Sequence, residues 1–387
     1  MDFELEEQHK MLQAAVRQFL RAECPPERAR KEDEEKIFPA DLYKKIAELG
    51  WIGLPFPKAY GGGGGNILDV CIIAEELAHS SFGLALVYIL SVCFGGKTLE
   101  YSGTEEQKQH YLTKLCSADY WFSLALTEAE GGTDILGSIK TTAIQEGDDF
   151  IINGSKMYIT AAKVADYLVT FARTSEGHSK RGDGFSLILV PAKAPGVQIN
   201  HLDTLVFRSP GTCEIFFDDV RVPVSNLLGV RDKGWYSLTN TLNHERVTLA
   251  ACCVGMAQAA FDMALQYAKQ RKAFGKPIGQ FQAIQHYLAE LSVEIDAARL
   301  LTYRAAWQFS QGLPAGISAA KADMYASEVA TKAANIGMRI LGGAGFLMDY
   351  DMQRIYRESL VNVTGPISNE MVKNRIAEAE LGLPRSY

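Results

Sequence analysis

The chain has 387 residues, of which 47% are hydrophobic and 22% are charged, and its net charge is −7. This balance is ordinary for a globular protein of two or three domains, and it excludes the basic footprint of a nucleic-acid-binding protein. The seven cysteines form no C-x-x-C pair and no cluster with metal-ligand spacing. We therefore expect reduced, mostly buried thiols, no metal site and a cytoplasmic location, or the mitochondrial matrix if a presequence has been removed.

Residues 1–118 are predicted to be helical. Apolar residues recur with a period of 3.6 in residues 3–23, 38–51 and 68–80. The five glycines at 61–65 predict a flexible loop. The segment 80–96 carries no charge, but about 20 apolar residues are needed to cross a bilayer. We therefore expect a buried helix beside an apolar cavity and no membrane span.

The pattern changes at residue 119. Short β-rich runs alternate with Gly, Asp, Asn and Pro turns, which is typical of a β-sandwich or barrel; the runs cover 121–128, 141–160, 166–174, 185–192 and 213–223. Asn153-Gly154 predicts a two-residue hairpin turn. Long helical patterns return from residue 236 onward. The predicted domains are a helical domain over 1–118, a β domain over 119–235 and a helical bundle over 236–387.

Two segments of the β domain carry residues suited to a ligand. In LALTEAEGGTD, a strand leads Thr127 into a glycine-rich turn that ends at Thr133 and Asp134. Glycines let backbone N–H groups approach a ligand closely, and the hydroxyls supply donors. In INGSKMYITAAKVAD, the aromatic Tyr158 suits stacking on a planar cofactor, and Thr160 follows it. An ordinary glycine turn and a core tyrosine are the alternatives for these two patterns.

Two segments of the helical bundle also suit a ligand. Arg271 stands at a helix end before Phe274, and Gln282 opens the next helix. A planar guanidinium in that place suits a pyrophosphate. In MRILGGAGF, a helix stops at paired glycines, Gly342 and Gly343, which permit close approach of a cofactor. A solvated arginine and a simple helix cap are the alternatives.

In this order and spacing, the segments resemble the acyl-CoA dehydrogenase family of flavoproteins over essentially the whole chain. The resemblance extends from FELEEQHKML through FDDVRVPVSNLLG to the last helix. It implies an α+β fold with an N-terminal helical domain, a central β-barrel or sandwich and a C-terminal four-helix bundle. It also implies bound FAD, an acyl-CoA substrate, an electron-transfer flavoprotein as electron acceptor, and a homotetramer. No G-x-G-x-x-G follows a strand, which disfavours a nicotinamide enzyme of the Rossmann type.

The resemblance assigns a set of residues to FAD binding. Tyr158 stands where the family usually has Trp against the flavin, and Arg339 stands where many members have Gln. Arg271, Phe274 and Gln282 match positions that hold the FAD of a neighbouring subunit. The full set is Leu124, Leu126, Thr127, Thr133, Tyr158, Thr160, Arg271, Phe274, Gln282, Arg339, Gly343, Ser368 and Glu370.

The reaction that the resemblance implies needs a base to take the α-proton of the thioester while hydride leaves the β-carbon. A carboxylate suits this role because burial raises the pKa of a carboxyl group. Many members carry the base in a Tyr-Glu-Gly-Thr segment near the C-terminus, but here the Tyr and Glu positions hold Gly365 and Pro366. Other members carry it before an arginine, where this chain has Glu245. Glu370 is the reserve candidate.

Glu245 belongs to the triplet His244-Glu245-Arg246. It is followed on one helical stripe by apolar residues that would turn the carboxylate inward, namely Leu249, Cys253, Met256 and Ala260. Arg246 lies about 100° round the helix, so it serves a different partner. The resemblance assigns Thr133, Asn243 and Arg246 to substrate binding, and His244 to a structural or CoA-facing role. A solvated glutamate in a first helical turn is the alternative for Glu245.

The expected reaction oxidises an acyl-CoA to the 2-enoyl-CoA in fatty acid or carboxylic acid catabolism. The same site run in reverse gives an enoyl-CoA reductase, as in crotonobetainyl-CoA reductases, which resemble this chain in their His-Glu-Arg triplet. A flavin oxidase or monooxygenase is a third alternative, and a non-enzymatic subunit is disfavoured by the retained Glu245 and Arg246. The uncharged segment 80–96 favours an apolar acyl group, and the small Gly365-Pro366 pair favours a branched or cyclic one.

Overall fold

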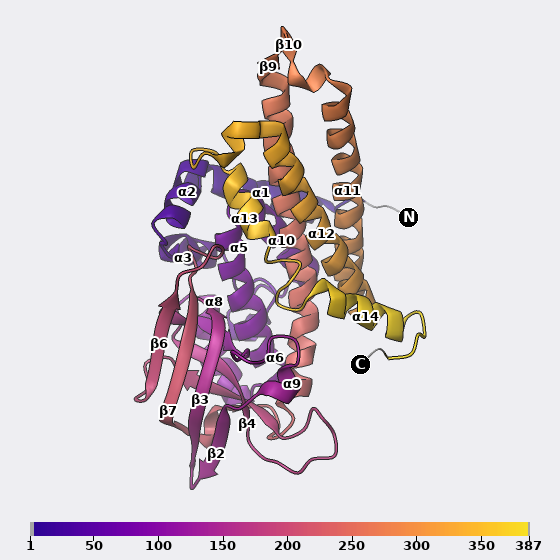
Figure 1. The fold of residues 1–387 in the computed structure, drawn as a ribbon. Coiled ribbons are helices and arrows are strands. Elements are labelled where there is room, and N and C mark those ends of the chain that lie inside the picture. Colours follow the sequence, from indigo (N-terminus) through magenta and orange to yellow (C-terminus); the bar gives the residue numbers. More distant parts are fainter. Residues whose placement is uncertain (1–3, 386–387) are drawn as a thin grey trace. The chain divides into compact units, whose positions relative to one another are not determined.

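The computed structural model describes residues 4–385, and its internal contacts divide the chain into two units. The first, here called the helical unit, comprises Met1–Ile37, Ile67–Ala85 and Arg246–Tyr387. The second, called the sheet unit, comprises Phe38–Asn66 and Leu86–Glu245. The long helix α10 (Gly234–Gln270) runs without a break through the change from the sheet unit to the helical unit (Figure 1).

The helical unit confirms the periodicity seen in the sequence. Besides the second part of α10 it contains α1 (Glu7–Glu23), α2 (Pro26–Glu34), α4 (Ile67–Ser80), α11 (Gln282–Ser310), α12 (Gly316–Leu341), η7 (Gly342–Phe346), α13 (Met352–Ser359) and α14 (Asn369–Ala379). Between α10 and α11 the chain forms a short hairpin of β9 (Lys272–Ala273) and β10 (Lys276–Pro277), followed by the 3-10 turn η6 (Ile278–Gln280). Figure 1 shows this hairpin at the far end of α10 and α11.

A buried polar cluster joins three helices of the helical unit. The carboxylate of Glu75 on α4 accepts hydrogen bonds from Arg299 Nε at 2.9 Å and from the Tyr303 hydroxyl at 2.8 Å, both on α11. Arg299 Nη2 also donates to Gln258 Oε1 on α10 at 2.9 Å. Because buried polar groups are costly unless they are paired, this cluster fixes the relative placement of α4, α10 and α11.

The uncharged segment near residue 90 is helical and buried, as predicted. It consists of α5 (Phe82–Ile89), the π-helical stretch η2 (Leu90–Lys97) and α6 (Thr98–Ser102). By length and composition alone, residues 82–102 and α10 are apolar enough to cross a membrane, and their apolar windows are 100% and 78% buried inside the structure. Core helices of globular proteins pass the same test, so these two windows are weak evidence for a membrane span.

The sheet unit contains a mixed eight-stranded sheet. Its strands lie in the order β6-β7-β3-β2-β4-β5-β8, and β1 pairs in parallel with β4. The strands are β1 (Phe122–Ala125), β2 (Thr142–Glu146), β3 (Asp149–Thr160), β4 (Tyr167–Arg173), β5 (Phe185–Pro191), β6 (Val197–Leu202), β7 (Thr212–Pro223) and β8 (Leu227–Leu228). The β-rich runs are thus confirmed as strands. The sequence analysis missed β6, an edge strand whose VQINHL sequence is only partly buried.

The sheet unit also contains short helical elements before and between its strands. They are α3 (Ala40–Glu48), η1 (Lys58–Tyr60), α7 (Glu105–Gln107), η3 (Lys108–Leu112), α8 (Thr113–Cys116), α9 (Ile135–Ser138), η4 (Ala162–Val164) and η5 (Val224–Asn226). At α7, the Thr104 side chain accepts from the Gln107 N–H at 3.2 Å, and the Gln107 side chain accepts from the Thr104 N–H at 2.9 Å. This reciprocal capping explains why a helix starts directly after Gly103.

The predicted hairpin turn at Asn153-Gly154 is wrong, because both residues lie inside β3. The turn between β2 and β3 falls at 147–148 instead, and the β3–β7 register shifts between Ile152 and Gly154. Gly154 has a φ of +141°, and a Cβ on it would lie 2.6 Å from the Cα of Thr141. Asn153 exchanges two hydrogen bonds of 2.9 Å with Asp219 on β7. Asn153 thus faces a β-bulge whose extra residue lies on β7, and Gly154 packs closely against Thr141, the residue before β2.

The glycine run at 61–65 is an ordered turn rather than the predicted flexible loop. Its N–H groups donate to backbone oxygens of residues 53–58 over 2.7–3.1 Å. At Gly62, a Cβ would lie 2.1 Å from the carbonyl oxygen of Phe56, so no larger residue fits there. The glycines thus serve close backbone packing within the sheet unit.

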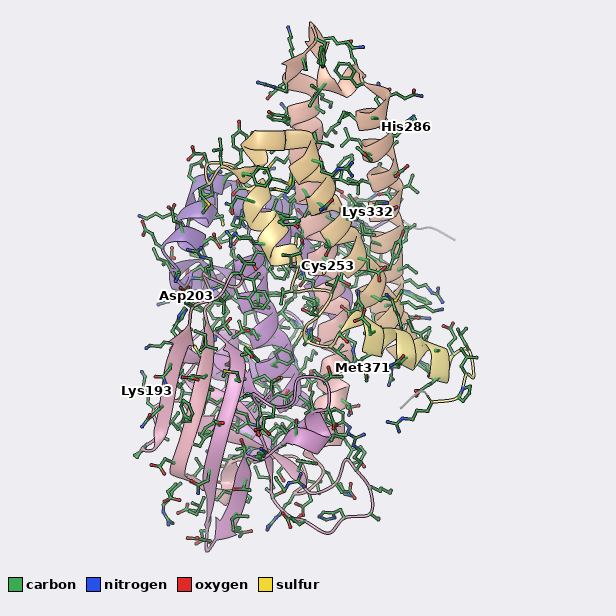
Figure 2. The ribbon with its side chains drawn as sticks, viewed as in Figure 1. Lys193, Asp203, Cys253, His286, Lys332 and Met371 are labelled. Atoms are coloured by element: carbon green, nitrogen blue, oxygen red, sulfur yellow. The ribbon has the colours of Figure 1, made fainter. Side chains whose placement is uncertain are left out.

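The cysteines are free and buried, as the sequence predicts; Cys253, within α10, is marked in Figure 2. Within residues 4–385, the structure gathers no group of three or more His, Cys, Asp or Glu side chains that could hold a metal ion.

Candidate functional site

The end of β1 and the end of β3 come together in the sheet unit and bring four of the predicted FAD residues into one place. The Met157 N–H donates to the Thr127 carbonyl at 2.9 Å, and Ser123 Oγ donates to the Thr160 carbonyl at 2.6 Å. Leu124 and Leu126 belong to the same segment of β1 and its continuation. Leu126 is buried, whereas Thr127 and Thr160 keep partial access to solvent.

Thr133 lies beyond this cluster, in the exposed turn that leads to α9. Its neighbour Asp134 caps α9 by accepting the Gly137 N–H at 3.2 Å, and it forms an ion pair with Arg181. The turn therefore has a structural reason for its Asp, while the Thr133 hydroxyl remains exposed and able to meet a ligand.

Tyr158 has an unusual backbone conformation. Its φ is +62°, which is rare for a residue with an aromatic side chain, and the β3–β7 register shifts between Lys156 and Ile159. The shift frees the Met157 N–H for Thr127 and turns Tyr158 outward, where its side chain is 61% exposed. Backbone strain of this kind clusters at ligand sites, so the exposed Tyr158 ring at this bulge is a candidate ligand contact.

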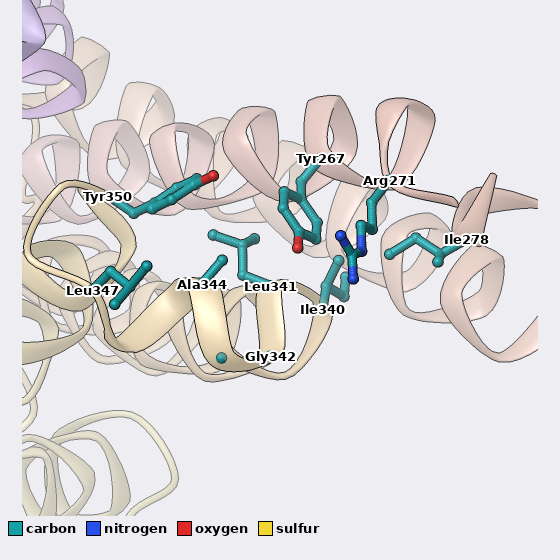
Figure 3. A pocket seen from close by; sticks show the side chains of 10 residues that line it. Tyr267, Arg271, Ile278, Ile340, Leu341, Gly342, Ala344, Leu347 and Tyr350 are labelled. Carbon is teal, nitrogen blue, oxygen red and sulfur yellow. The ribbon is translucent and has the colours of Figure 1, made fainter. Parts of the chain in front are cut away.

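The helical unit contains a cavity of about 520 Å³ at the end of α10 (Figure 3). Tyr267 on α10 and Arg271 directly after it extend toward the 340–344 segment, and Ile278 and Tyr350 also line the cavity. The Ile278 N–H donates to the Arg271 carbonyl at 2.8 Å, which closes the β9–β10 hairpin beside the cavity.

The chemistry of this cavity suits an aromatic ligand that carries phosphate. Arg271 supplies a permanent positive charge with several donors. Gly342 and Gly343 have no side chain, and a Cβ on either would meet nothing within 4 Å, so the wall is open there. The tyrosines offer flat faces and hydroxyl groups. Among the predicted FAD residues, Arg271 and Gly343 line the cavity.

Three other predicted FAD residues of the helical unit lie outside the lining of the cavity. Phe274 sits at the hairpin tip with 94% of its surface exposed, and Gln282 is exposed at the start of α11. Arg339 donates to the Tyr287 hydroxyl at 2.7 Å and covers the Tyr287 ring at 4.8 Å, so its guanidinium is already engaged within the chain.

The C-terminal pair Ser368 and Glu370 lies at the start of α14. Ser368 is its N-cap, and its hydroxyl accepts from the Met371 N–H at 3.5 Å. Glu370 stands exposed in the first turn, where a carboxylate favours the helix dipole. Helix capping accounts for Ser368, and the helix dipole accounts for Glu370.

Glu245 is buried in the middle of α10, with 3% of its surface exposed. The alternative of a solvated glutamate in a first turn is wrong, because α10 begins at Gly234, about three turns earlier. The stripe predicted from the sequence is buried as well; it consists of Leu249, Cys253, Met256 and Ala260. A carboxylate on this stripe is withdrawn from bulk water, which is the environment that a base for carbon acids needs.

His244 forms a pair with Tyr101 in the sheet unit. Its Nε2 lies 3.0 Å from the Tyr101 hydroxyl, and its Nδ1 lies 3.4 Å from the Asn240 carbonyl. Burial, together with the positive charge of Lys97, lowers the pKa of His244 to about 4. Burial raises the pKa of Tyr101 to about 12. Both side chains are therefore neutral at pH 7, and the Tyr101 hydroxyl donates a hydrogen bond to His244 Nε2 in the tautomer whose Nδ1–H donates to the Asn240 carbonyl.

Arg246, the first residue of α10 in the helical unit, interacts electrostatically with Asp323 on α12. Burial raises the pKa of Asp323 to about 7, and the Arg246 charge opposes that rise. Sequence analysis missed Asp323. The available signal was a single acid on an otherwise alanine-rich buried face of α12. Asn243, the remaining predicted substrate residue, is half-buried two positions before Glu245.

Comparison with known proteins identifies the family. Three acyl-CoA dehydrogenase family models match, described as the N-terminal, middle and C-terminal domains, over residues 6–119, 123–220 and 232–381. A probable acyl-CoA dehydrogenase of Bacillus subtilis is 40% identical over 379 residues, covering 97% of this chain and 99% of that protein. A subunit of the caffeyl-CoA reductase–Etf complex of Acetobacterium woodii is 36% identical, covering 92% and 93%.

A solved structure supports the same assignment. The glutaryl-coenzyme A dehydrogenase–glutaryl-CoA complex superposes with a TM-score of 0.95 and 35% identity, covering 100% of this chain and 98% of that one. The α+β fold with helical, sheet and helical domains is therefore confirmed. The chain belongs to the acyl-CoA dehydrogenase family, whose members are FAD-binding oxidoreductases that act on the CH–CH bond of acyl-CoA.

Proposed function

We propose that this chain oxidises an acyl-CoA thioester to the 2-enoyl-CoA, with Glu245 as the base that removes the α-proton. The observation that carries the proposal is the burial of Glu245 inside α10. The positions where many relatives carry the base hold Gly365 and Pro366 instead, and the reserve candidate Glu370 is exposed. Glu245 is thus the carboxylate best suited to abstract a proton away from bulk water.

The residues present fit FAD in charge and shape. In the helical unit, Arg271 and the side-chain-free Gly342 and Gly343 suit the pyrophosphate of an FAD that a neighbouring copy of the chain holds. In the sheet unit, Thr127 and the outward-turned Tyr158 suit the flavin ring. When bound, FAD supplies the acceptor for the hydride that leaves the substrate β-carbon.

The residues of α10 divide the remaining work between them. Glu245 takes the α-proton, and its burial keeps water from competing for the carboxylate. Arg246 and Asn243 bind the CoA and thioester part of the substrate, and Asp323 on α12 is the electrostatic partner of Arg246. Hydrogen bonds to the thioester oxygen lower the pKa of the α-carbon, as in an oxyanion hole. His244 is neutral at pH 7 and supports α10 through Tyr101.

The second candidate function is the reverse reaction, reduction of a 2-enoyl-CoA. It is favoured by the likeness to a caffeyl-CoA reductase subunit, since the same base would then return the α-proton. That relative works in a complex with Etf, which supports an electron-transfer flavoprotein as the electron partner of this chain in either direction.

We further propose a cytoplasmic homotetramer that acts on an apolar acyl group, branched or cyclic. Val293, Leu300 and Trp307 recur every seven residues on α11 and are exposed, which gives a helix face suited to a second copy. The apolar, buried 82–102 helices support a neutral acyl chain over a dicarboxylate. Faster turnover of straight-chain than of branched or cyclic acyl-CoAs would contradict the proposed preference for a branched or cyclic acyl group.

The test is anaerobic bleaching of the bound flavin by a panel of acyl-CoAs, comparing wild type with Glu245→Gln. We expect Glu245→Gln to keep its yellow flavin but to bleach about 10²- to 10⁴-fold more slowly, because a positioned base contributes that much. Asp262→Asn, the same chemical change on the partly exposed side of α10, is the matched control and keeps the wild-type rate. Wild-type bleaching by Glu245→Gln would overturn the assignment and turn attention to Glu370→Gln.

A further inference from the structure

A buried ion pair lies next to the loop that follows β1 in the sheet unit, residues 128–141. Lys156 on β3 is completely buried, and its Nζ donates to Glu128 Oε1 at 2.9 Å and to the Leu126 carbonyl at 3.0 Å. Glu128 is buried as well and accepts the Lys140 N–H at 2.7 Å and the Thr141 N–H at 3.0 Å. None of the roles assigned above uses either side chain.

These contacts converge on the backbone around Thr127. Lys156 holds the residue before it through the Leu126 carbonyl, and Glu128 is the residue after it. The Thr127 carbonyl itself accepts the Met157 N–H, from the position next to Lys156. The Glu128 carboxylate also ties the two ends of the 128–141 loop together, since it accepts N–H groups where that loop enters β2.

Stability alone is a weak reason for this pair. Removing two charges from water is costly, and apolar side chains of similar volume often stabilise a fold as well or better. Burial lowers the pKa of Lys156, while the pKa of Glu128 stays below its usual value because the Lys156 charge and the hydrogen bonds outweigh its burial. What an ion pair with directed hydrogen bonds adds over apolar packing is a defined backbone geometry.

We infer that Lys156 and Glu128 are positioning residues for FAD, which hold the Leu126–Glu128 backbone in the conformation that presents Leu124, Thr127 and the following turn to the cofactor. The inference rests on the proposed assignment of these residues to FAD. It predicts that loss of the ion pair raises the FAD dissociation constant and changes the flavin spectrum, even in a variant whose apoprotein keeps much of its melting temperature.

The test compares Lys156→Met with the double variant Lys156→Met/Glu128→Gln. Lys156→Met leaves a buried carboxylate without its cation, so it also destabilises the fold. The double variant is neutral and restores much of the melting temperature of the apoprotein, but the Leu126 carbonyl still lacks its donor. We expect both to raise the FAD dissociation constant about 10- to 100-fold, in line with the loss of hydrogen bonds to a charged group. We also expect a shifted visible absorption and circular dichroism of the bound flavin.

Asp166→Asn is the matched control. Asp166 is also a carboxylate that accepts a backbone N–H, from Trp121 at 2.8 Å, but at the opposite end of β1. We expect it to lower the melting temperature and to leave FAD affinity and the flavin spectrum unchanged. A double variant with wild-type affinity and spectrum, or an Asp166→Asn variant with an equal loss, would overturn the positioning role. Wild-type protein that binds no FAD would instead overturn the proposed function.

Discussion

The loop after β1 in the sheet unit and the β9–β10 hairpin in the helical unit both carry residues assigned to FAD, but they are held in different ways. The loop is fixed from the inside, because the buried Glu128 and Lys156 engage its backbone at both ends. The hairpin is short, and its tip residue Phe274 is 94% exposed. The loop therefore has its shape before any ligand arrives, whereas the tip of the hairpin presents an almost fully exposed aromatic side chain.

The difference suggests that the fold of the chain itself shapes the loop, whereas a second copy of the chain completes the site at the hairpin. The hairpin leads directly into α11, whose exposed Val293, Leu300 and Trp307 form the proposed interface between copies. If a neighbouring subunit covers this face, the hairpin acquires its partner at the same time. Changes to α11 should then disturb the hairpin part of the FAD site and spare the loop part.

The largest effect is expected from Leu300→Glu combined with Trp307→Glu. Symmetry-related copies would bring these charges together in an apolar interface, and like charges there cost several kcal/mol, or about a thousandfold in association. Analytical ultracentrifugation should show a smaller species, and FAD should bind more weakly. Ile144→Glu, an exposed apolar residue changed in the same way on β2, is the control and keeps the wild-type sedimentation. Unchanged sedimentation of the double variant would exclude α11 as the interface.

The next effect concerns Gly154, which packs against Thr141 where the 128–141 loop enters β2. Gly154→Ala should destabilise the apoprotein by about 2–3 kcal/mol, because its Cβ would strike the Thr141 backbone and its φ of +141° disfavours alanine. Urea unfolding measures this free energy. Gly132→Ala is the matched control, since its Cβ would meet nothing within 4 Å, and its stability should stay within about 0.5 kcal/mol of wild type. Equal stability of the two variants would show that the bulge relaxes freely.

Gly154 also shows what the sequence can and cannot predict. The Asn-Gly pair is a strong local hairpin signal, but β3 continues through it because Asn153 pairs with Asp219, a residue 66 positions further along the chain. Local patterns did predict the long helices, the main strands and the inward stripe of Glu245. They succeed where the outcome depends on residues within one element.

The missed residues depend on contacts between distant parts of the chain. Lys156 lies 28 residues from Glu128, and Asp323 lies on a different helix from Arg246. As isolated letters, each of these charged residues suggests a solvated surface. Only the packed structure shows that these groups are buried.

A smaller effect separates the hairpin from the loop directly. Phe274→Ala should leave the stability of the apoprotein within about 0.5 kcal/mol of wild type, because the side chain is almost fully exposed. It should nevertheless weaken FAD binding about tenfold, as expected when an aromatic side chain loses the surface that it buries on binding. Urea unfolding and FAD titration measure the two quantities. A loss of stability without a change in FAD affinity would show that Phe274 supports the fold and does not contact FAD.

The smallest effect tests the internal packing of the sheet unit at His244. Because its pKa is lowered to about 4, the folded protein binds fewer protons than the unfolded chain between about pH 4 and 6.5. The contribution of His244 to stability is therefore complete above pH 6.5 and is lost as the pH falls toward 4. Between pH 7 and pH 5, urea unfolding should show wild type losing about 1 kcal/mol more than His244→Gln, a value reduced for partial exposure. Tyr101→Phe removes the hydroxyl that faces Nε2 and should shrink this difference; equal losses in wild type and His244→Gln would show that the imidazole is not held neutral by its surroundings.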